Sequence, residues 1–194
     1  RRRVAPHEAA DSAPPGASKW RAEAGPIAAW LAGAAPVNLI AVGLEAGVSS
    51  RGEGWAPAFR LGVLVSRTGT VTPSTSLGNF AWNVARAVAC PLRLGLDDER
   101  FSVRPCVLAD LGWMRVEGSD TQDFIEARDA SHFWAALGPS LLVGYAASRF
   151  SVEVGAAVLA NLDRKSYVLR EPYVPVYTAK RALITAQLGV RLAF

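Results

Sequence analysis

Two cysteines are the residues of this sequence whose chemistry is easiest to predict. Cys90 and Cys106 stand eight residues before and after Asp98, which is the middle of a short polar turn at Leu96–Arg100. A simple antiparallel hairpin around that turn places Cys90 opposite Cys106, so we predict a cross-strand disulfide, which an oxidising compartment permits. A shift of one residue in register would separate the sulfur atoms to opposite faces of the sheet and leave two thiols.

Ser131 and His132 are a second candidate for chemistry, because Asp129 and Glu126 lie close to them in the sequence. A serine, a histidine and an acid can form a nucleophilic site, but only in a geometry that the sequence does not show. Neighbouring Ser and His residues are also common by chance, so we expect no catalytic residues. Two cysteines and the remote His7 are too few ligands for a metal site, and we expect no metal and no cofactor.

The charge and composition of the chain indicate a single folded domain. Its 194 residues are 51% hydrophobic and 20% charged, which excludes a disordered chain. The 21 basic and 17 acidic residues are spread along the sequence, apart from Arg1–Arg3, so we do not expect nucleic-acid binding. Residues 1–18 are rich in Ala, Pro, Ser and Gly and predict a linker or disordered segment, and residues 19–194 form the predicted domain.

No signal segment opens the sequence, and we expect the targeting segment to lie outside it.

Alternation of apolar and polar residues predicts an all-β fold. From Ala182 to Phe194 every second residue is apolar, which is the pattern of a strand with one apolar face. Eight segments show this period of two, at residues 19–31, 37–50, 57–66, 77–96, 101–115, 131–146, 149–160 and 182–194. The uncharged stretch Ala24–Leu44 is long enough for a membrane helix, but its glycines and prolines favour two strands joined by a turn. We therefore predict an eight-stranded antiparallel up-and-down barrel.

The fourth of these segments is the least regular. Arg86 interrupts the face that carries Trp82, Val84 and Val88, which we interpret as the apolar face. Proline cannot donate a ladder hydrogen bond, so we predict a β-bulge near Pro91 that switches the register of this strand.

The length of the strands and the placement of aromatic residues favour a membrane barrel. The predicted strands have about 10 to 15 residues, whereas a strand of a soluble protein typically has about 5 or 6 and a tilted membrane strand about 9 to 11. Aromatic residues stand near both ends of the apolar faces, as in the interfacial girdles of membrane barrels. Short turns at 51–54, 97–99 and 147–148 alternate with longer connections at 67–76, 116–130 and 161–180, the short connection at 33–36 being an exception. This alternation predicts both termini on the short-turn, periplasmic side.

If the apolar faces point outward, the opposite faces fill the lumen with polar and charged side chains. These are Arg21, Glu23, Glu45, Arg60, Arg104, Asp110, Glu153, Gln187 and Arg191. Buried charges are costly unless they are paired, so we expect an internal network of ion pairs and hydrogen bonds. An eight-stranded barrel is just wide enough for side chains, so we expect a filled lumen and no open pore.

The terminal strand, which ends TAQLGVRLAF, and the alternating segments with aromatic ends resemble small eight-stranded outer-membrane proteins of the OmpA/OmpX type. The richness in Ala, Gly and Leu and the two cysteines are also similar to uncharacterised barrel proteins of high-GC bacteria such as myxobacteria. The resemblance covers residues 19–194 and implies a monomer in a bacterial outer membrane, in contact with its lipid. It also implies that Val190, Leu192 and Phe194 form the signal that the barrel-assembly machinery reads.

We predict a structural or surface-interaction role for this barrel, and the sequence does not identify a ligand. Some barrels of the outer membrane modify lipid A as acyltransferases or deacylases, and Ser131 with His132 keeps such an enzyme as one alternative. The other alternative is a soluble calycin-like carrier. In that fold the apolar faces would point inward around an apolar ligand, and the charged faces would point outward.

Overall fold

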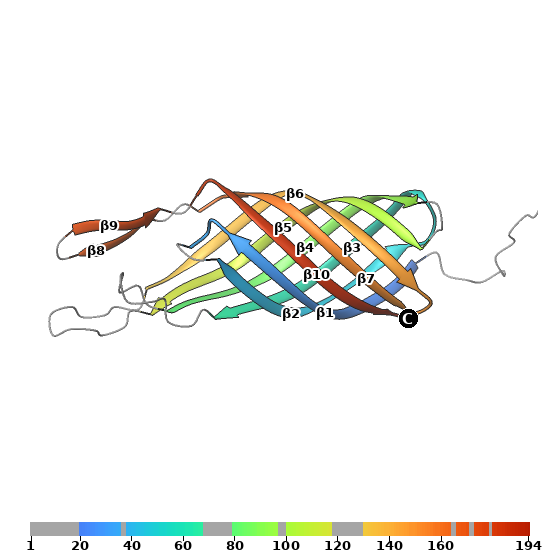
Figure 1. Cartoon of the computed structure of the whole chain (residues 1–194), viewed down its shortest axis with the longest axis horizontal. Helices are drawn as coiled ribbons and strands as arrows, with labels where there is room; N and C mark the ends of the chain where they lie inside the picture. The colour runs from blue at the N-terminus through green and yellow to red at the C-terminus, as the bar shows by residue number, and fades with distance from the viewer. Residues whose placement is uncertain are drawn as a thin grey trace, which may run out of the picture.

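A computed structural model describes residues 20–35, 38–67, 79–96, 100–117, 130–163, 166–170, 173–178 and 180–194. In these residues eight strands close into an antiparallel barrel (Figure 1). The barrel strands are β1 (Trp20–Ala32), β2 (Leu39–Ser50), β3 (Gly54–Arg67), β4 (Asn79–Leu96), β5 (Phe101–Glu117), β6 (Ala130–Ala147), β7 (Phe150–Asn161) and β10 (Ala182–Ala193). They follow one another around the barrel, and β10 closes it by pairing with both β7 and β1. The predicted fold is confirmed.

Two further strands form a separate hairpin in the connection between β7 and β10. They are β8 (Ser166–Arg170) and β9 (Tyr173–Thr178), and the hairpin lies beyond one end of the barrel (Figure 1). The sequence pattern predicted a connection without strands at 161–180, and this prediction was wrong. Segments of five and six residues are too short for a period of two to stand out from chance. The predicted linker at 1–18 lies outside the described residues.

The predicted pair of strands in the uncharged stretch Ala24–Leu44 is present as β1 and β2. These strands pair along almost their whole length, from Trp20 opposite Ser50 to Leu31 opposite Leu39. Within the described residues, no helix is long and apolar enough to cross a membrane.

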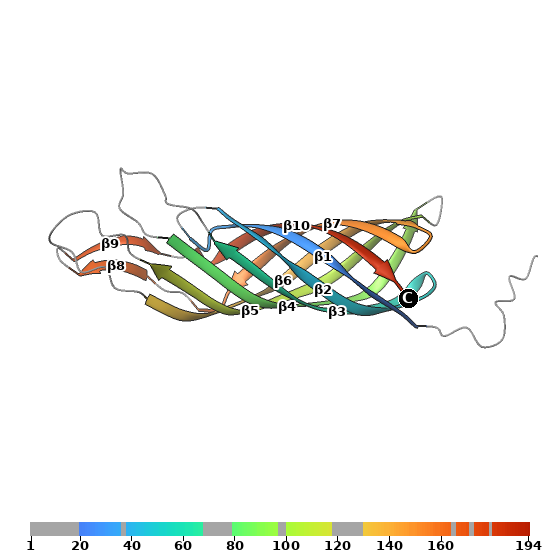
Figure 2. The same cartoon turned by 90° about the horizontal axis from the view of Figure 1, so that it is seen from below.

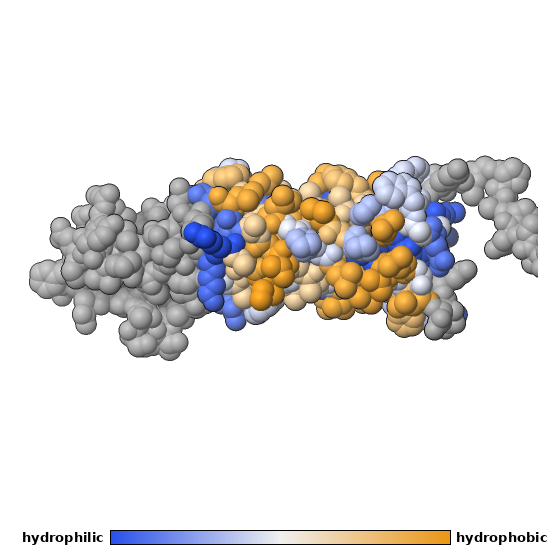
Figure 3. Space-filling model, turned by 90° about the horizontal axis from the view of Figure 1, so that it is seen from above, coloured by the Kyte–Doolittle hydropathy of each residue, from blue (hydrophilic) through white to orange (hydrophobic). Residues whose placement is uncertain are grey.

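The outer wall of the barrel is apolar, as the alternation predicted for seven of the eight strands. On β2, the side chain of Leu44 is 65% exposed, whereas that of the next residue, Glu45, is 3% exposed. On β10, Leu188 is 50% exposed and its neighbour Gln187 is 7% exposed. Figure 3 shows apolar side chains over the wall and hydrophilic ones gathered toward its two ends. This distribution is the reverse of that of a calycin-like carrier, and it suits a wall that faces lipid.

β4 is the strand whose faces were predicted wrongly. Trp82, Val84, Arg86 and Val88 all point into the lumen and are at most 4% exposed, and the alternating positions that face outward are mostly alanines. Arg86 therefore belongs to an inward face and does not interrupt an outward one. The error has a physical reason, since alternation shows which residues share a face but not which face meets the lipid.

The predicted β-bulge in β4 is present. The pairing of β4 with β5 shifts by one residue between Ala89 and Leu94, a segment that includes Pro91. Beyond the shift the parity of the strand is reversed, and Leu94 and Leu96 are each 50% exposed on the outer wall. Before the bulge, the even-numbered residues of β4 point into the lumen. After the bulge, the even-numbered residues point outward.

The two ends of the barrel differ in their connections (Figures 1 and 2). β2 and β3 are joined by Arg51–Glu53, and β6 and β7 by Ser148–Arg149, at the end where β1 begins and β10 ends. In these tight turns Gly52 and Ser148 have positive φ angles of 111° and 56°. We call this end the short-turn end, and the opposite end, which carries the β8–β9 hairpin, the long-loop end.

Candidate functional site in the barrel lumen

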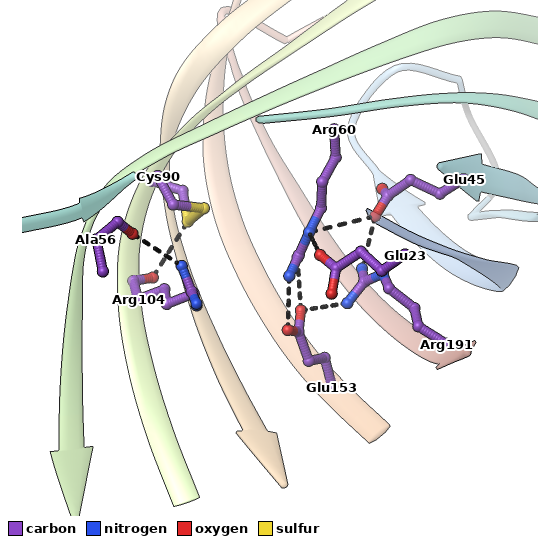
Figure 4. The surroundings of a disulfide bond; sticks show 9 residues. Glu23, Glu45, Ala56, Arg60, Cys90, Arg104, Glu153 and Arg191 are labelled. Carbon is purple, nitrogen blue, oxygen red and sulfur yellow. Dashed lines mark hydrogen bonds and ion pairs between the residues drawn. A yellow bond between two sulfur atoms is a disulfide. The ribbon is translucent and has the colours of Figure 1, made fainter. Parts of the chain in front are cut away.

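Arg60 lies at the centre of a network of ion pairs inside the lumen (Figure 4). It stands on the inward face of β3 and is 1% exposed. Its Nε donates to Oε1 of Glu23 on β1 at 2.8 Å, and its Nη1 and Nη2 donate to the two carboxylate oxygens of Glu153 on β7 at 2.6 and 2.7 Å. One guanidinium group therefore connects three strands that are not neighbours in the barrel.

Arg191 on β10 completes this network. Its Nη2 donates to Oε1 of Glu45 on β2 at 2.6 Å, and its Nη1 lies 2.5 Å from Oε2 of Glu153. Buried charges cost several kcal/mol each unless they are paired, and here each of the three carboxylates has an arginine partner. We call Glu23, Glu45, Arg60, Glu153 and Arg191 the ionic cluster.

Glycines on the inward faces make room for the ionic cluster. A Cβ atom added at Gly144 would lie 3.0 Å from Cγ of Glu153, and one added at Gly47 would lie 2.7 Å from Cγ of Arg60. These contacts are tighter than a packed interior normally has, so a larger residue at Gly144 would push Glu153, and one at Gly47 would press on Arg60 and on the backbone oxygen of Phe59. These two glycines are therefore part of the site.

A second buried ion pair joins β4 and β5. Nε and Nη2 of Arg86 donate to the two carboxylate oxygens of Asp110, both at 2.8 Å, and Nη1 donates to Oε1 of Gln187 on β10, also at 2.8 Å. Arg86 is 1% exposed and Asp110 is fully buried. A bidentate arrangement of this kind is the strongest form that an Arg–carboxylate pair takes.

Toward the long-loop end the lumen is filled by large apolar side chains. Trp82 and Trp134 pack edge to face, with ring centroids 5.4 Å apart. Each of the eight barrel strands contributes one side chain that is at most 1% exposed. We call these residues the apolar plug: Leu31, Leu39, Leu64, Trp82, Met114, Trp134, Leu159 and Leu183.

Cys90 of β4 and Cys106 of β5 form the predicted disulfide, inside the lumen (Figure 4). Their Cα atoms are 4.0 Å apart, and the two residues are 1% and 5% exposed. Cys90 directly follows Ala89, where the regular pairing of β4 with β5 stops. The bridge therefore holds the two strands together at the point where their hydrogen-bond ladder is interrupted.

A cavity of about 80 Å³ lies between the ionic cluster and the short-turn end. Arg104 of β5 lines it, is 7% exposed, and donates from Nη1 to the backbone oxygen of Ala56 at 3.2 Å. Arg21 of β1 also lines it and donates from Nη2 to the backbone oxygen of Ser148 at 3.2 Å. The charged residues around this cavity are Arg21, Glu23, Arg51, Arg60, Arg93, Arg104 and Glu153.

The structure brings the residues expected in the lumen together in three places. Five of them form the ionic cluster. Asp110 and Gln187 lie with Arg86, and Arg21 and Arg104 line the cavity.

Arg86 and Arg93 were not predicted as lumen residues, although the signal for Arg86 was present. Arg86 and Asp110 are equally distant from Asp98, the turn residue that also relates the two cysteines. The hairpin register that predicts the disulfide therefore also predicts Arg86 opposite Asp110, and these two residues are paired in the structure.

Ser131 and His132 lie at the beginning of β6, and the two acids considered with them, Asp129 and Glu126, lie outside the described residues. Successive side chains of a strand point to opposite faces, so Ser131 and His132 point away from each other. In the part of the chain that the structure describes, no three His, Cys, Asp or Glu side chains are grouped so that they could hold a metal ion.

The three residues of the predicted assembly signal lie on the outer wall of β10. Val190, Leu192 and Phe194 are 41%, 42% and 79% exposed. The amide of Phe194 donates to the backbone oxygen of Ala22 at 3.0 Å, so the pairing of β10 with β1 continues to the last residue. These side chains therefore share the face that meets the lipid.

Aromatic pairs mark both ends of the apolar wall. Phe101 and Tyr145 pack with ring centroids 4.9 Å apart near the short-turn end, and Trp113 and Phe133 pack at 6.1 Å near the long-loop end. From Phe101 to Trp113 the strand rises about 40 Å at about 3.3 Å per residue, which a tilt of about 40° reduces to about 30 Å. This height is close to the apolar band of about 25 Å in outer-membrane barrels.

Comparison with known proteins shows the fold. No protein-family model and no curated protein matches the chain. Among solved structures, the chain is similar to Neisserial surface protein A, with 13% identity and a TM-score of 0.56 over 91% of this chain and 98% of that one. It is also similar to a major outer membrane protein from Thermus thermophilus, with 12% identity and a TM-score of 0.62 over 90% of this chain and 99% of that one. The fold is that of outer-membrane β-barrels, and the apolar wall between two aromatic belts agrees with a bacterial outer membrane as the location of this chain.

Proposed function

We propose that this chain is a monomeric outer-membrane barrel with a closed lumen, which presents its long-loop end at the cell surface in a structural or binding role. The apolar plug is the observation that carries the proposal. Every barrel strand contributes one large buried apolar side chain to it among the described residues, which supports a lumen without a water-filled channel. The barrel then serves as an anchor for what it presents and does not conduct solutes.

The β8–β9 hairpin is the proposed contact surface. It extends beyond the barrel, and its two strands pair with each other and with no other strand in the described residues. The outer edge of each strand therefore offers backbone N–H and C=O groups to which a partner can add a strand. A hairpin carried on a rigid barrel suits a surface-interaction role.

The terminal residues Val190, Leu192 and Phe194 are the proposed assembly signal. Their alternation on one face of the strand that closes the barrel supports this role. Replacing Phe194 by Ser should lower the amount of folded barrel in the outer membrane, measured by heat-modifiable mobility of the membrane fraction. Replacing the equally outward-facing Ile184 by Ser is the control, because it lies at the opposite end of β10.

Tag accessibility and conductance test the proposal. An epitope placed between β8 and β9 should bind antibody on intact cells, whereas the same epitope in the Arg51–Glu53 turn should bind only after permeabilisation. The purified barrel should migrate as a monomer and should show no porin-like conductance in planar bilayers. Antibody access in the opposite order would overturn the proposed orientation, and sustained conductance would overturn the closed lumen.

A further inference from the structure

We propose that the cavity at the short-turn end binds a small multivalent oxyanion with the chemistry of phosphate. The site lies on the periplasmic side in the proposed orientation, but it depends only on the residues around the cavity and not on a surface role. Three features support this anion site: the charge around the cavity, the hydrogen-bond partner of Arg104, and the volume and hydrogen-bond donors of the cavity.

The charge around the cavity is positive. Five arginines and two glutamates line it, which is a formal charge of +3. The nearby Glu45 and Arg191 pair with each other and leave this balance unchanged. Glu53, whose carboxylate lies against Gly95, lowers the local balance only to +2. Among the described residues, the balance stays positive at +1 even when Arg93 is left out of the count, because four arginines then face three glutamates.

Arg104 is the residue that most needs a further partner. It is 7% exposed, and its guanidinium group donates to the neutral backbone oxygen of Ala56. Arg60 and Arg191 each contact carboxylates, whereas no described carboxylate lies within ion-pair distance of Arg104. A buried cation without a counterion costs several kcal/mol, and an anion in the adjacent cavity would remove that cost.

The space and its donors select the kind of anion. A volume of about 80 Å³ exceeds the roughly 10–15 Å³ that one water needs, so the space has room for a small anion. The planar fork of a guanidinium group matches two oxygens of an oxyanion better than it matches a spherical halide. Hydroxyl groups of Ser102 and Ser151 also line the cavity and can donate to the remaining oxygens.

Titration with inorganic phosphate tests this site. The barrel is folded in micelles of a phosphate-free zwitterionic detergent, such as an amine oxide, and followed by amide chemical shifts, with sodium chloride at equal ionic strength as the reference. We expect saturable shifts at Ser102 and Ser151 that chloride does not produce. Shifts that rise linearly without saturation, or that are the same in chloride, would overturn the proposal.

Two variants separate the site from general surface charge. Arg104→Gln should weaken phosphate binding at least tenfold, and Arg149→Gln should leave it within twofold of the wild-type value. Arg149 is exposed in the β6–β7 turn and does not line the cavity, so it is a matched control. Equal binding by Arg104→Gln and the wild type would show that the cavity is not the site.

A rim variant covers the case in which Arg104→Gln does not fold. Arg21→Gln removes a partly exposed arginine from the edge of the cavity and should weaken phosphate binding severalfold while the barrel keeps its heat-modifiable mobility. Unchanged binding by this variant would contradict the proposal.

Lipid nanodiscs then distinguish a free anion from a lipid headgroup. If the site takes a headgroup phosphate, nanodiscs of phosphatidylcholine and phosphatidylglycerol should weaken the apparent phosphate affinity relative to micelles of a phosphate-free detergent. Equal affinities in the nanodiscs and in the phosphate-free micelles assign the site to a free anion.

Discussion

The two halves of the lumen are filled by opposite kinds of side chain. The five residues of the ionic cluster are joined by ion pairs of 2.5–2.8 Å, whereas the eight residues of the apolar plug are large apolar side chains packed in the lumen. Ion pairs need defined partners at defined distances, but apolar packing needs mainly the right volume. The half with the ionic cluster therefore suits the recognition of a polar ligand, and the half with the plug supports the proposed closed lumen.

The largest effect of a substitution in either half is expected at Glu153. Glu153→Ala leaves Arg60 and Arg191 buried without a shared carboxylate, and should lower the free energy of unfolding by up to about 5 kcal/mol. Glu153→Gln keeps the shape but loses the charge, and should lose most of the same stability. The measurement is reversible urea unfolding in phospholipid vesicles, followed by tryptophan fluorescence. Val154→Ala, which changes the adjacent lipid-facing residue, is the control and should cost much less. A fully stable Glu153→Gln variant would show that the ionic cluster depends on shape and not on charge.

The apolar plug should respond to volume. Trp134→Ala should lower the free energy of unfolding by about 4 kcal/mol, because it leaves a large cavity against Trp82. Trp134→Phe should cost far less, since it retains an aromatic ring and removes an indole N–H that has no acceptor among the described residues. The same unfolding assay applies, with Phe133→Ala on the outer wall as the control. If Trp134→Phe were as destabilising as Trp134→Ala, the plug would require one defined side chain at this position, as the ionic cluster does, and not only the right volume.

The disulfide should contribute less than either of these. It joins residues 16 apart in sequence, and cross-links of about that length typically stabilise by about 3 kcal/mol, chiefly by restricting the unfolded chain. The double variant Cys90→Ala and Cys106→Ala should lose about that amount and still fold into a heat-modifiable barrel. Each single variant should lose about the same stability as the double variant. If the double variant failed to fold into a heat-modifiable barrel, the disulfide would be required for assembly.

The smallest effect is expected at the rim of the ionic half. Arg21 is partly exposed and makes a hydrogen bond of 3.2 Å to a backbone oxygen, so Arg21→Ala should cost about 1 kcal/mol or less. Urea unfolding again measures it, with Arg149→Ala as a matched rim control. If Arg21→Ala lowered the free energy of unfolding as much as Glu153→Ala, Arg21 would have to be counted as a member of the ionic cluster.

The outer wall was predictable from sequence to a greater extent than the lumen. A period of two fixes which side chains share a face, and residues such as Leu44, Leu188 and Phe194 were placed correctly by it. It does not fix the direction of the face, which is why the large residues of β4 around Trp82 were placed on the wrong side. There mostly alanines meet the lipid, and the bulky side chains are needed to fill the lumen.

Partners within the lumen depend on distances across the barrel that a sequence does not contain. The Arg86–Asp110 pair and the disulfide lie within one hairpin, and a turn centred on Asp98 is enough to predict them. The pairs of Arg60 with Glu23 and Glu153 join strands far apart in the chain, and they depend on the tilt and closure of the barrel. Local register was therefore accessible, and the contacts across the lumen were not.

The position of the Cys90–Cys106 bridge sets an order of events for the maturing chain. Both sulfur atoms belong to residues that are at most 5% exposed, and a finished wall surrounds them. An oxidoreductase in the periplasm needs direct access to a thiol to transfer a disulfide. It has that access only while the sheet is still open, so we expect the Cys90–Cys106 disulfide to form before β10 closes the barrel.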